Sequence, residues 1–332
     1  MKNLAAVCFV VAAAVLAAGP MASAGQPGKS PVKVFILAGQ SNMEGQAVVD
    51  LDHPRDYNGG KGNLEYVMKH SPDAAMYKHL KDAAGKWVVR DDVWITYKLG
   101  SGKLLAGGLG LGYSCYGDQH HFGPELQFGH VVGDALDNQV LLIKTAWGGK
   151  SLYVDFRPPS SGGQVGPFYT KMIEEVRDSL ANIKKNFPAY DGRGYEIAGF
   201  VWQQGWNDMC TAPAIPEYTQ NLANLIKDLR KEFKVPNLPV VVGELGNGGP
   251  DAKGAMLEFR KAQAAIADVP ELKGAVVFVK TAQFARPANE SPNVSHGHHW
   301  FGNAESYFMV GDALGKAMVE LVAPAAASKK TK

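Results

Sequence analysis

The chain has 332 residues, of which 46% are hydrophobic and 20% are charged, with 34 Lys and Arg against 32 Asp and Glu. This composition excludes a disordered or collagen-like chain, and three cysteines are too few for a disulfide scaffold. A nearly neutral balance also argues against nucleic acid as a partner, because nucleic-acid binders carry a clear excess of clustered Lys and Arg. The length allows one large α/β domain or two smaller ones.

The first 24 residues are predicted to be a secretory signal peptide. Lys2 precedes an apolar stretch at 4–18, and the small residues at 22–24 (ASA) form a cleavage site. The apolar stretch is shorter than the roughly 20 residues of a transmembrane helix, and no later segment is long and apolar enough to span a membrane. We therefore expect a secreted or periplasmic protein, with no membrane span in the mature chain. Residues 323–332 are predicted to be a disordered tail.

The mature chain alternates between two kinds of segment. Runs rich in β-branched residues predict buried strands at 32–38, 139–145, 197–203, 238–243 and 275–280. Helical periodicity follows at 125–136, 167–187, 216–234, 253–268 and 303–322. This alternation predicts a doubly wound α/β fold with a central parallel sheet of about five strands. Region 46–115 breaks the alternation, and we expect it to be a long insertion over the sheet edge.

Polar residues follow the first three predicted strands, where sites form in such folds. Ser41, in 39–43 (GQSNM), is a candidate nucleophile with backbone N–H groups nearby, or alternatively a helix N-cap. Gly148 and Gly149 let the backbone approach a ligand closely, although a tight loop is the simpler reading. Asn207 follows a glycine and has an amide that can donate to an oxyanion.

A late histidine cluster at 295–300 (SHGHHW) offers a general base, which a serine nucleophile needs. The alternative is a zinc site that joins these histidines to His120 or His121. We favour the base, because adjacent histidines do not easily chelate one ion and no His-Glu-x-x-His pattern is present. We accordingly expect no metal and no organic cofactor. The sequence leaves open whether Cys115 and Cys210 form a disulfide.

These blocks, in this order, resemble the SGNH (GDSL-like) hydrolase superfamily. The segments at 35–45 (FILAGQSNMEG), 123–125 (GPE), 147–149 (WGG) and 202–205 (WQQG) are most similar to its sialate O-acetylesterase branch, akin to acetylxylan esterases of carbohydrate esterase family six. The resemblance covers roughly residues 32 to 320. It implies a three-layer α/β/α, flavodoxin-like fold, with residues 25–322 as a single esterase domain.

The resemblance also implies roles for individual residues. Ser41 is expected to be the nucleophile and His299 the base, with an oxyanion hole formed by Ser41 N–H, Gly148 or Gly149 N–H and the Asn207 side chain. We favour His299 over His298 because His299 directly precedes Trp300. The expected substrate-binding residues are Gln40, Trp147, Gln204, Trp206 and Trp300.

The chain departs from the family pattern at two places. An acidic residue usually stands three positions before the catalytic histidine, where this chain has His296. The group that orients His299 is therefore open among a backbone carbonyl and the side chains of Asp208, Glu290, Glu244 and His296. The esterase branch usually reads Gln-Gly-Glu-Ser where this chain has 204–207 (QGWN).

The resulting hypothesis is a secreted serine esterase that removes O-acetyl groups from carbohydrates through an acyl-enzyme on Ser41. The alternatives are a catalytically silent carbohydrate-binding member of the same fold and a metal-dependent hydrolase. We expect Glu125 to stabilise the first turn of a helix, and the alternative is a place in the pocket wall.

Overall fold

The computed structural model describes residues 28–322. The predicted signal peptide and the predicted tail at 323–332 lie outside the described residues. Within 28–322, no helix is both long and apolar enough to cross a membrane.

The centre of the molecule is a seven-stranded sheet in the order β4-β3-β6-β1-β7-β8-β9. Every pairing is parallel except that of the edge strand β4 with β3. The five strands predicted from sequence are all present and lie in the order 2-1-3-4-5, which is the flavodoxin-like arrangement. The strands are β1 (Lys29–Gly39), β3 (Arg90–Lys98), β4 (Leu104–Leu109), β6 (Asn138–Ala146), β7 (Tyr195–Gln203), β8 (Val240–Gly243) and β9 (Val276–Val279).

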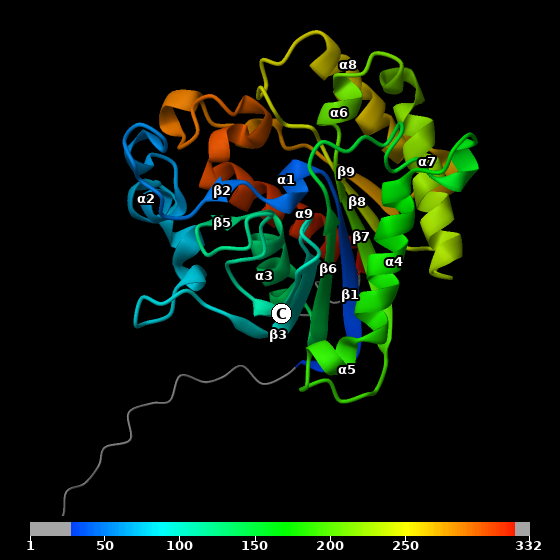
Figure 1. Ribbon diagram of the computed structural model, residues 1–332, viewed down its shortest axis with the longest axis horizontal. Coiled ribbons are helices and arrows are strands. Elements are labelled where there is room, and N and C mark those ends of the chain that lie inside the picture. The colour runs from blue at the N-terminus through cyan, green and yellow to red at the C-terminus, as the bar shows by residue number, and fades with distance from the viewer. Residues whose placement is uncertain (1–27, 323–332) are drawn as a thin grey trace, which may run out of the picture.

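Helices cover both faces of the sheet (Figure 1). One face packs against α4 (Pro167–Ala181), α7 (Ala214–Glu232) and α8 (Ala255–Ala264). The other packs against α2 (Leu64–His70), α3 (Glu125–Ala135) and α9 (Ala304–Val322). Shorter α-helices are also present at α1 (Ser41–Glu44), α5 (Ile183–Asn186) and α6 (Trp206–Met209).

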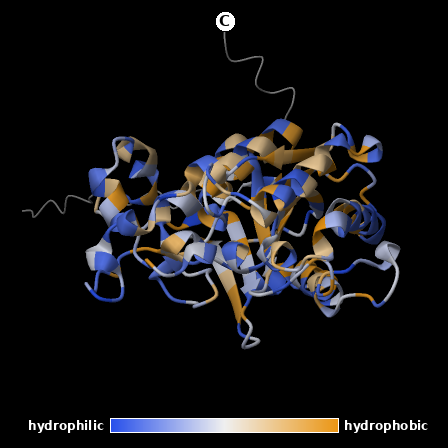
Figure 2. Cartoon of the chain, turned by 90° about the horizontal axis from the view of Figure 1, so that it is seen from above, coloured by the Kyte–Doolittle hydropathy of each residue, from blue (hydrophilic) through white to orange (hydrophobic). Residues whose placement is uncertain are grey.

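The continuous apolar runs are explained by this three-layer arrangement. In β1, Val34 and Ile36 enter the core under α4 and α7, whereas Phe35 and Leu37 enter the core under α3 and α9. Both sets of side chains are buried because successive strand residues point to opposite faces. Hydrophobic residues accordingly gather between the two helix layers (Figure 2).

Region 46–115 was expected to lie over the edge of the sheet, and in the structure it also contributes strands to the sheet. It supplies β3, which pairs parallel with β6, and β4, which pairs antiparallel with β3. It also supplies α2 and the short strand β2 (Ala47–Val48), which pairs with β5 (His121–Phe122). The sheet therefore has two more strands than the five expected.

Candidate active site

The register of the sheet brings three strand exits to one edge. Gly39, the last residue of β1, pairs with Ala146 of β6 and Gln203 of β7. Strand β1 is flanked by β6 on one side and by β7 on the other, so the strand order reverses at β1. This edge is therefore the topological switch point, where ligands bind in open α/β sheets. A Cβ on Gly39 would lie 2.1 Å from the Gln203 carbonyl oxygen, so only glycine allows this approach.

Ser41 is the first residue of α1, directly beyond β1. Gln40 occupies the N-cap position, so the alternative of Ser41 as an N-cap does not hold. The residue is 8% exposed, and within residues 28–322 its hydroxyl takes part in no hydrogen bond. The hydroxyl is therefore not committed to a structural contact.

The glycine turn after β6 lies against this serine. A Cβ on Gly148 would lie 3.7 Å from Ser41 Cβ and 3.0 Å from Glu44 Oε2, which leaves little room for any side chain. Gly149 has a φ of 70°, a conformation that favours glycine. Asn207 Nδ2 donates to the Gly149 carbonyl at 2.9 Å. Ser41 and Gly148 are thus neighbours, and Asn207 is joined to the same turn through Gly149.

Two buried glutamines fix the turn after β7. Gln40 Oε1 accepts from Gly205 N–H at 3.1 Å and from Gln204 Nε2 at 3.3 Å, and Gln40 Nε2 donates to Asn207 Oδ1 at 3.2 Å. Gln40 is 3% exposed and Gln204 is 2% exposed. Both were expected to bind substrate, but their side chains are occupied in holding Asn207 and the turn beside Ser41.

The histidine segment packs against the same serine turn. Asn42 Nδ2 donates to the His298 carbonyl at 3.2 Å. The Tyr307 hydroxyl contacts Asn42 Oδ1 at 2.7 Å and the His299 carbonyl at 3.3 Å. His299 therefore lies on a segment tied directly to the residue that follows Ser41.

The three histidine rings are clustered. The His299 ring centroid lies 4.1 Å from that of His298 and 6.3 Å from that of His296. Burial, reinforced by the neighbouring His298 and His296, lowers the pKa of His299 from about 6.5 to about 4. His299 is therefore neutral at neutral pH, the form in which imidazole accepts a proton.

The four side chains considered for orienting His299 make their hydrogen bonds elsewhere or lie exposed. Asp208 accepts from the backbone N–H groups of Leu152 and Tyr153, at 2.8 and 2.9 Å, and Glu244 accepts from those of 281 and 282, both at 2.8 Å. Glu290 is exposed and lines a separate pocket. His296 is exposed beside the other two histidines. Within 28–322, none of the four is hydrogen-bonded to the His299 ring.

The three tryptophans divide into two that are buried and one that is partly exposed. Trp147 is 5% exposed and packs against Phe156 and Phe168, with ring centroids 5.9 and 5.3 Å away. Trp300 is 2% exposed and packs edge-on against Tyr307 at 5.0 Å. Trp206 is only partly buried, and its ring lies 5.8 Å from that of His298. Of these three, Trp206 is the one placed to contact a ligand beside the histidines.

A buried charged cluster behind the serine turn escaped the sequence analysis. Lys144 Nζ donates to the carbonyls of Glu44 and Tyr113, both at 2.7 Å, and pairs with Glu125 Oε2 at 2.8 Å. The Lys144 side chain is fully buried and that of Glu125 is 1% exposed. Glu125 does stand in the first turn of α3, as expected, and it also forms this ion pair. The cluster could have been suspected from sequence, because Lys144 lies inside a strand predicted to be covered on both faces.

Glu44, at the end of α1, also escaped the sequence analysis. Its Oε1 accepts from the Tyr97 hydroxyl at 3.3 Å, and its carboxylate faces the Gly148 backbone. Burial raises its pKa above the ordinary value, although the Gly148 N–H and Lys144 oppose the change. A carboxylate therefore stands next to the glycine turn that borders the nucleophile.

The residues of the metal hypothesis are paired elsewhere. His120 contacts Asp50 at 2.7 Å and His121 contacts Asp118 at 3.0 Å. Among residues 28–322, no three His, Cys, Asp or Glu side chains are grouped to hold a metal ion. In the part of the chain that the structure describes, Cys115 and Cys210 form no disulfide.

Comparison with known proteins identifies the family. A family model described as "Carbohydrate esterase, sialic acid-specific acetylesterase" matches residues 31–320. A probable carbohydrate esterase of Arabidopsis thaliana is 24% identical over 226 residues, which cover 66% of this chain and 71% of that protein.

Solved structures show the same fold. The X-ray structure of this Arabidopsis protein has a TM-score of 0.56 at 18% identity, covering 88% of this chain and 100% of the other. A carbohydrate acetylesterase from Xanthomonas citri has a TM-score of 0.54 at 15% identity, covering 88% of this chain and 57% of the other. NanS has a TM-score of 0.53 at 15% identity, covering 89% and 98%. The chain belongs to the carbohydrate esterase family of sialic acid-specific acetylesterases.

Proposed function

We propose that the chain is a serine esterase that removes O-acetyl groups from carbohydrates. The observation that carries this proposal is the convergence of Ser41, Gly148, Gly149 and Asn207 at the switch point, with the His299 segment tied to the same turn through Asn42. The family match and the Xanthomonas citri carbohydrate acetylesterase support the choice of an acetylated sugar as substrate.

The proposed reaction proceeds in two steps. His299 takes the Ser41 proton as Ser41 Oγ attacks the acetyl carbonyl carbon, and the tetrahedral oxyanion is stabilised by backbone N–H groups of Ser41 and Gly148 or Gly149 and by Asn207 Nδ2. Protonated His299 returns the proton to the sugar oxygen, which leaves as an alcohol. Water then attacks the acetyl-serine with His299 again as base, releasing acetate and restoring Ser41. Trp206 supplies a face for the sugar ring.

We propose that Ser41 and His299 act as a dyad in this enzyme. Asp208 and Glu244 are each engaged by two backbone N–H donors, and Glu290 lines another pocket. His296 is the one candidate whose ring neighbours that of His299, at 6.3 Å. Without a carboxylate partner, the imidazolium formed during the reaction lacks the stabilisation that the acid of a triad provides, and the neighbouring His298 and His296 disfavour its charge further.

The proposal includes export and a single catalytic unit. A leader at residues 1–24 would direct the chain to a secreted or periplasmic location, and its charge pattern and small-residue end support this assignment. Residues 25–322 are proposed to form one esterase domain, because a single family model matches residues 31–320.

The test compares wild type with Ser41→Ala and with Ser101→Ala, an exposed serine in the turn between β3 and β4. Hydrolysis of p-nitrophenyl acetate should fall at least about a thousandfold in Ser41→Ala and remain at the wild-type rate in Ser101→Ala. Equal rates for wild type and Ser41→Ala would refute the proposed mechanism.

A second candidate function is supported by the absence of a carboxylate on the His299 ring within residues 28–322. This candidate is a catalytically silent carbohydrate-binding member of the fold. A fluorophosphonate probe separates the two, because only an activated serine is labelled. We expect labelling of wild type and none of Ser41→Ala.

A further inference from the structure

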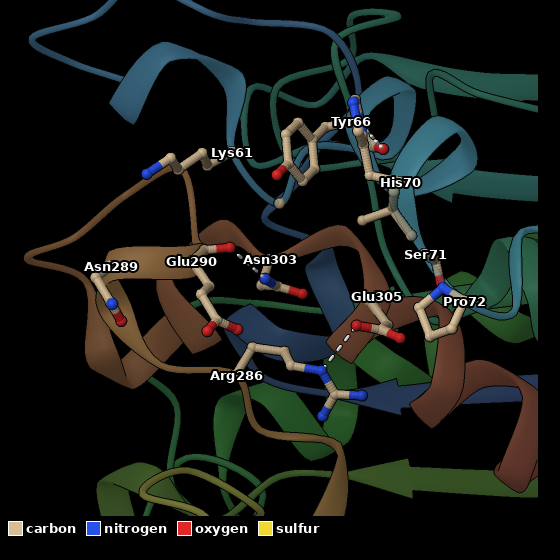
Figure 3. A pocket seen from close by; sticks show the side chains of 12 residues that line it. Lys61, Tyr66, His70, Ser71, Pro72, Arg286, Asn289, Glu290, Asn303 and Glu305 are labelled. Carbon is tan, nitrogen blue, oxygen red and sulfur yellow. Dashed lines mark hydrogen bonds and ion pairs between the residues drawn. The ribbon is translucent and has the colours of Figure 1, made fainter.

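A hollow of about 470 Å³ lies between α2 and the segment 286–305 (Figure 3). This volume falls within the roughly 300–1,000 Å³ typical of small-molecule sites. Ser41, Gly148, Asn207 and His299 are not among its lining residues, so the hollow is separate from the catalytic residues proposed above. We infer that this hollow is a second sugar-binding site, which holds a neutral pyranose unit of a glycan. The choice of a glycan rests on the proposed function.

One wall of the hollow is an aromatic ledge on α2. The rings of Tyr66 and His70 stack with centroids 4.2 Å apart and an interplanar angle of 24°. They stand four residues apart, which places both on one face of the helix. Tyr66 is 39% exposed although it is a large aromatic residue. Such an open ring offers an apolar face and a hydroxyl to the C–H and O–H groups of a sugar.

The opposite wall is polar and firmly held (Figure 3). Arg286 Nε donates to Glu305 Oε2 at 2.7 Å, and Arg286 Nη1 contacts two backbone carbonyls, whereas Nη2 has no hydrogen-bond partner within residues 28–322. Asn303, which is 2% exposed, donates to the Glu290 carbonyl at 3.2 Å and to Ser291 Oγ at 3.0 Å. The wall is therefore formed before any ligand binds.

The two walls are also joined to one another. The Ala304 N–H donates to the Gly62 carbonyl at 2.8 Å, immediately before α2 begins. A Cβ on Gly62 would lie 2.3 Å from the Glu290 carbonyl oxygen, so the backbones approach as closely as glycine allows. The ledge and the polar wall thus keep a fixed separation.

The charges of the lining favour a neutral, hydroxylated ligand. Lys61 and Arg286 are balanced by Glu290 and Glu305, and His70 adds an imidazole. Two carboxylates disfavour a phosphate or polyanion, and the charged groups disfavour a purely apolar ligand. Sugar hydroxyls both donate and accept, so they can use the ammonium, guanidinium and carboxylate groups together.

The experiment measures binding of unacetylated xylohexaose, cellohexaose and mannohexaose by isothermal titration calorimetry. The full-length protein is compared with Tyr66→Ala and Arg286→Met, both at side chains at the surface of the hollow. Tyr195→Ala is the matched control, because Tyr195 is 45% exposed and begins β7 at the opposite end of the sheet. We expect at least one hexasaccharide to bind, with an affinity about tenfold weaker in each hollow variant and unchanged in Tyr195→Ala.

Two outcomes overturn the inference. One is that none of the three hexasaccharides binds to wild type. The other is that Tyr66→Ala and Arg286→Met bind the hexasaccharides with wild-type affinity. If Trp206→Ala, measured alongside them, then weakens binding, the sugar binds beside the histidines and not in the hollow. These probes carry no ester, so the assay is independent of turnover: a protein that binds through Tyr66 but hydrolyses no acetyl ester would refute the proposed function and keep the inference.

Discussion

The chemistry proposed for Ser41 depends on how a single histidine is solvated. His299 lies partly buried in a cluster with His296 and His298, so its protonated form loses hydration and is repelled by any charge on its neighbours. Its pKa of about 4 makes it a weak base that is fully available across the neutral range.

This pKa predicts the pH dependence of the reaction. Because a lowered pKa keeps His299 unprotonated to lower pH, kcat/KM for p-nitrophenyl acetate should be constant around neutrality and fall through a midpoint of about 4. The measurement is a pH–rate profile, with far-UV circular dichroism at each pH to exclude unfolding. His296→Gln removes one neighbouring imidazole and should move the midpoint upward. His53→Gln, at an exposed histidine paired with Asp56, should leave it in place. A wild-type midpoint near 6.5 would contradict the buried environment described for His299.

At the scale of elements, the turn after β6 is held in place by the turn after β7. Asp208 at the start of α6 accepts the N–H groups of Leu152 and Tyr153 and the Gln204 amide, the last at 2.6 Å. Gln204 also donates to the Lys150 carbonyl at 3.0 Å. Burial raises the pKa of Asp208 to about 6, and the three donors oppose this rise. Asp208 thus fixes the loop that carries Gly148 and Gly149.

Asp208→Asn should therefore destabilise the protein. An amide in this place has only one acceptor oxygen, so a buried N–H loses its partner and the free energy of unfolding should fall by about 2 kcal/mol. Urea denaturation followed by tryptophan fluorescence measures the change. Asp251→Asn is the control, since Asp251 is an exposed loop residue, and it should remain within about 0.5 kcal/mol of wild type. An Asp208→Asn protein as stable as wild type would show that the loop does not depend on this carboxylate.

For the whole molecule, local sequence predicts the five adjacent strands from β6 to β9, but not β3 and β4, which complete the other edge of the sheet. The buried runs are apolar on both faces and are distinctive without any knowledge of contacts. In contrast, β3 begins with three charged residues (90–92) and β4 contains Gly107 and Gly108, and neither pattern is typical of a strand. Both strands depend on pairing, β3 with β6 and β4 with β3, and such long-range pairing is not readable from local propensity.

The same distinction applies to the site. Ser41, Gly148 and Asn207 could be placed near one another from sequence, because residues that follow parallel strands meet at one edge. The burial of Trp147 and Trp300 could not be predicted from sequence, because it depends on aromatic rings of other segments that pack against them. The partner of Lys144 was hidden for the same reason: Glu125 lies 19 residues away, on a helix packed on one face of the sheet.

The Lys144–Glu125 pair gives a prediction about global stability, because it joins β6, α3 and the end of α1. Lys144→Met should lower the free energy of unfolding by roughly 3–5 kcal/mol, since it leaves the Glu125 charge buried without its partner. Lys144→Met combined with Glu125→Leu removes that charge, so the double variant should be more stable than the Lys144→Met single variant. The matched control is the exposed pair Lys261–Glu258, whose charged atoms lie 2.9 Å apart. Lys261→Met should lower the free energy of unfolding by less than about 1 kcal/mol. Urea denaturation of wild type, Lys144→Met, Glu125→Leu and the double variant yields the coupling energy of the pair, and Lys261→Met is measured beside them. If the effects of the two single substitutions simply add in the double variant, the ion pair does not contribute to stability as a unit.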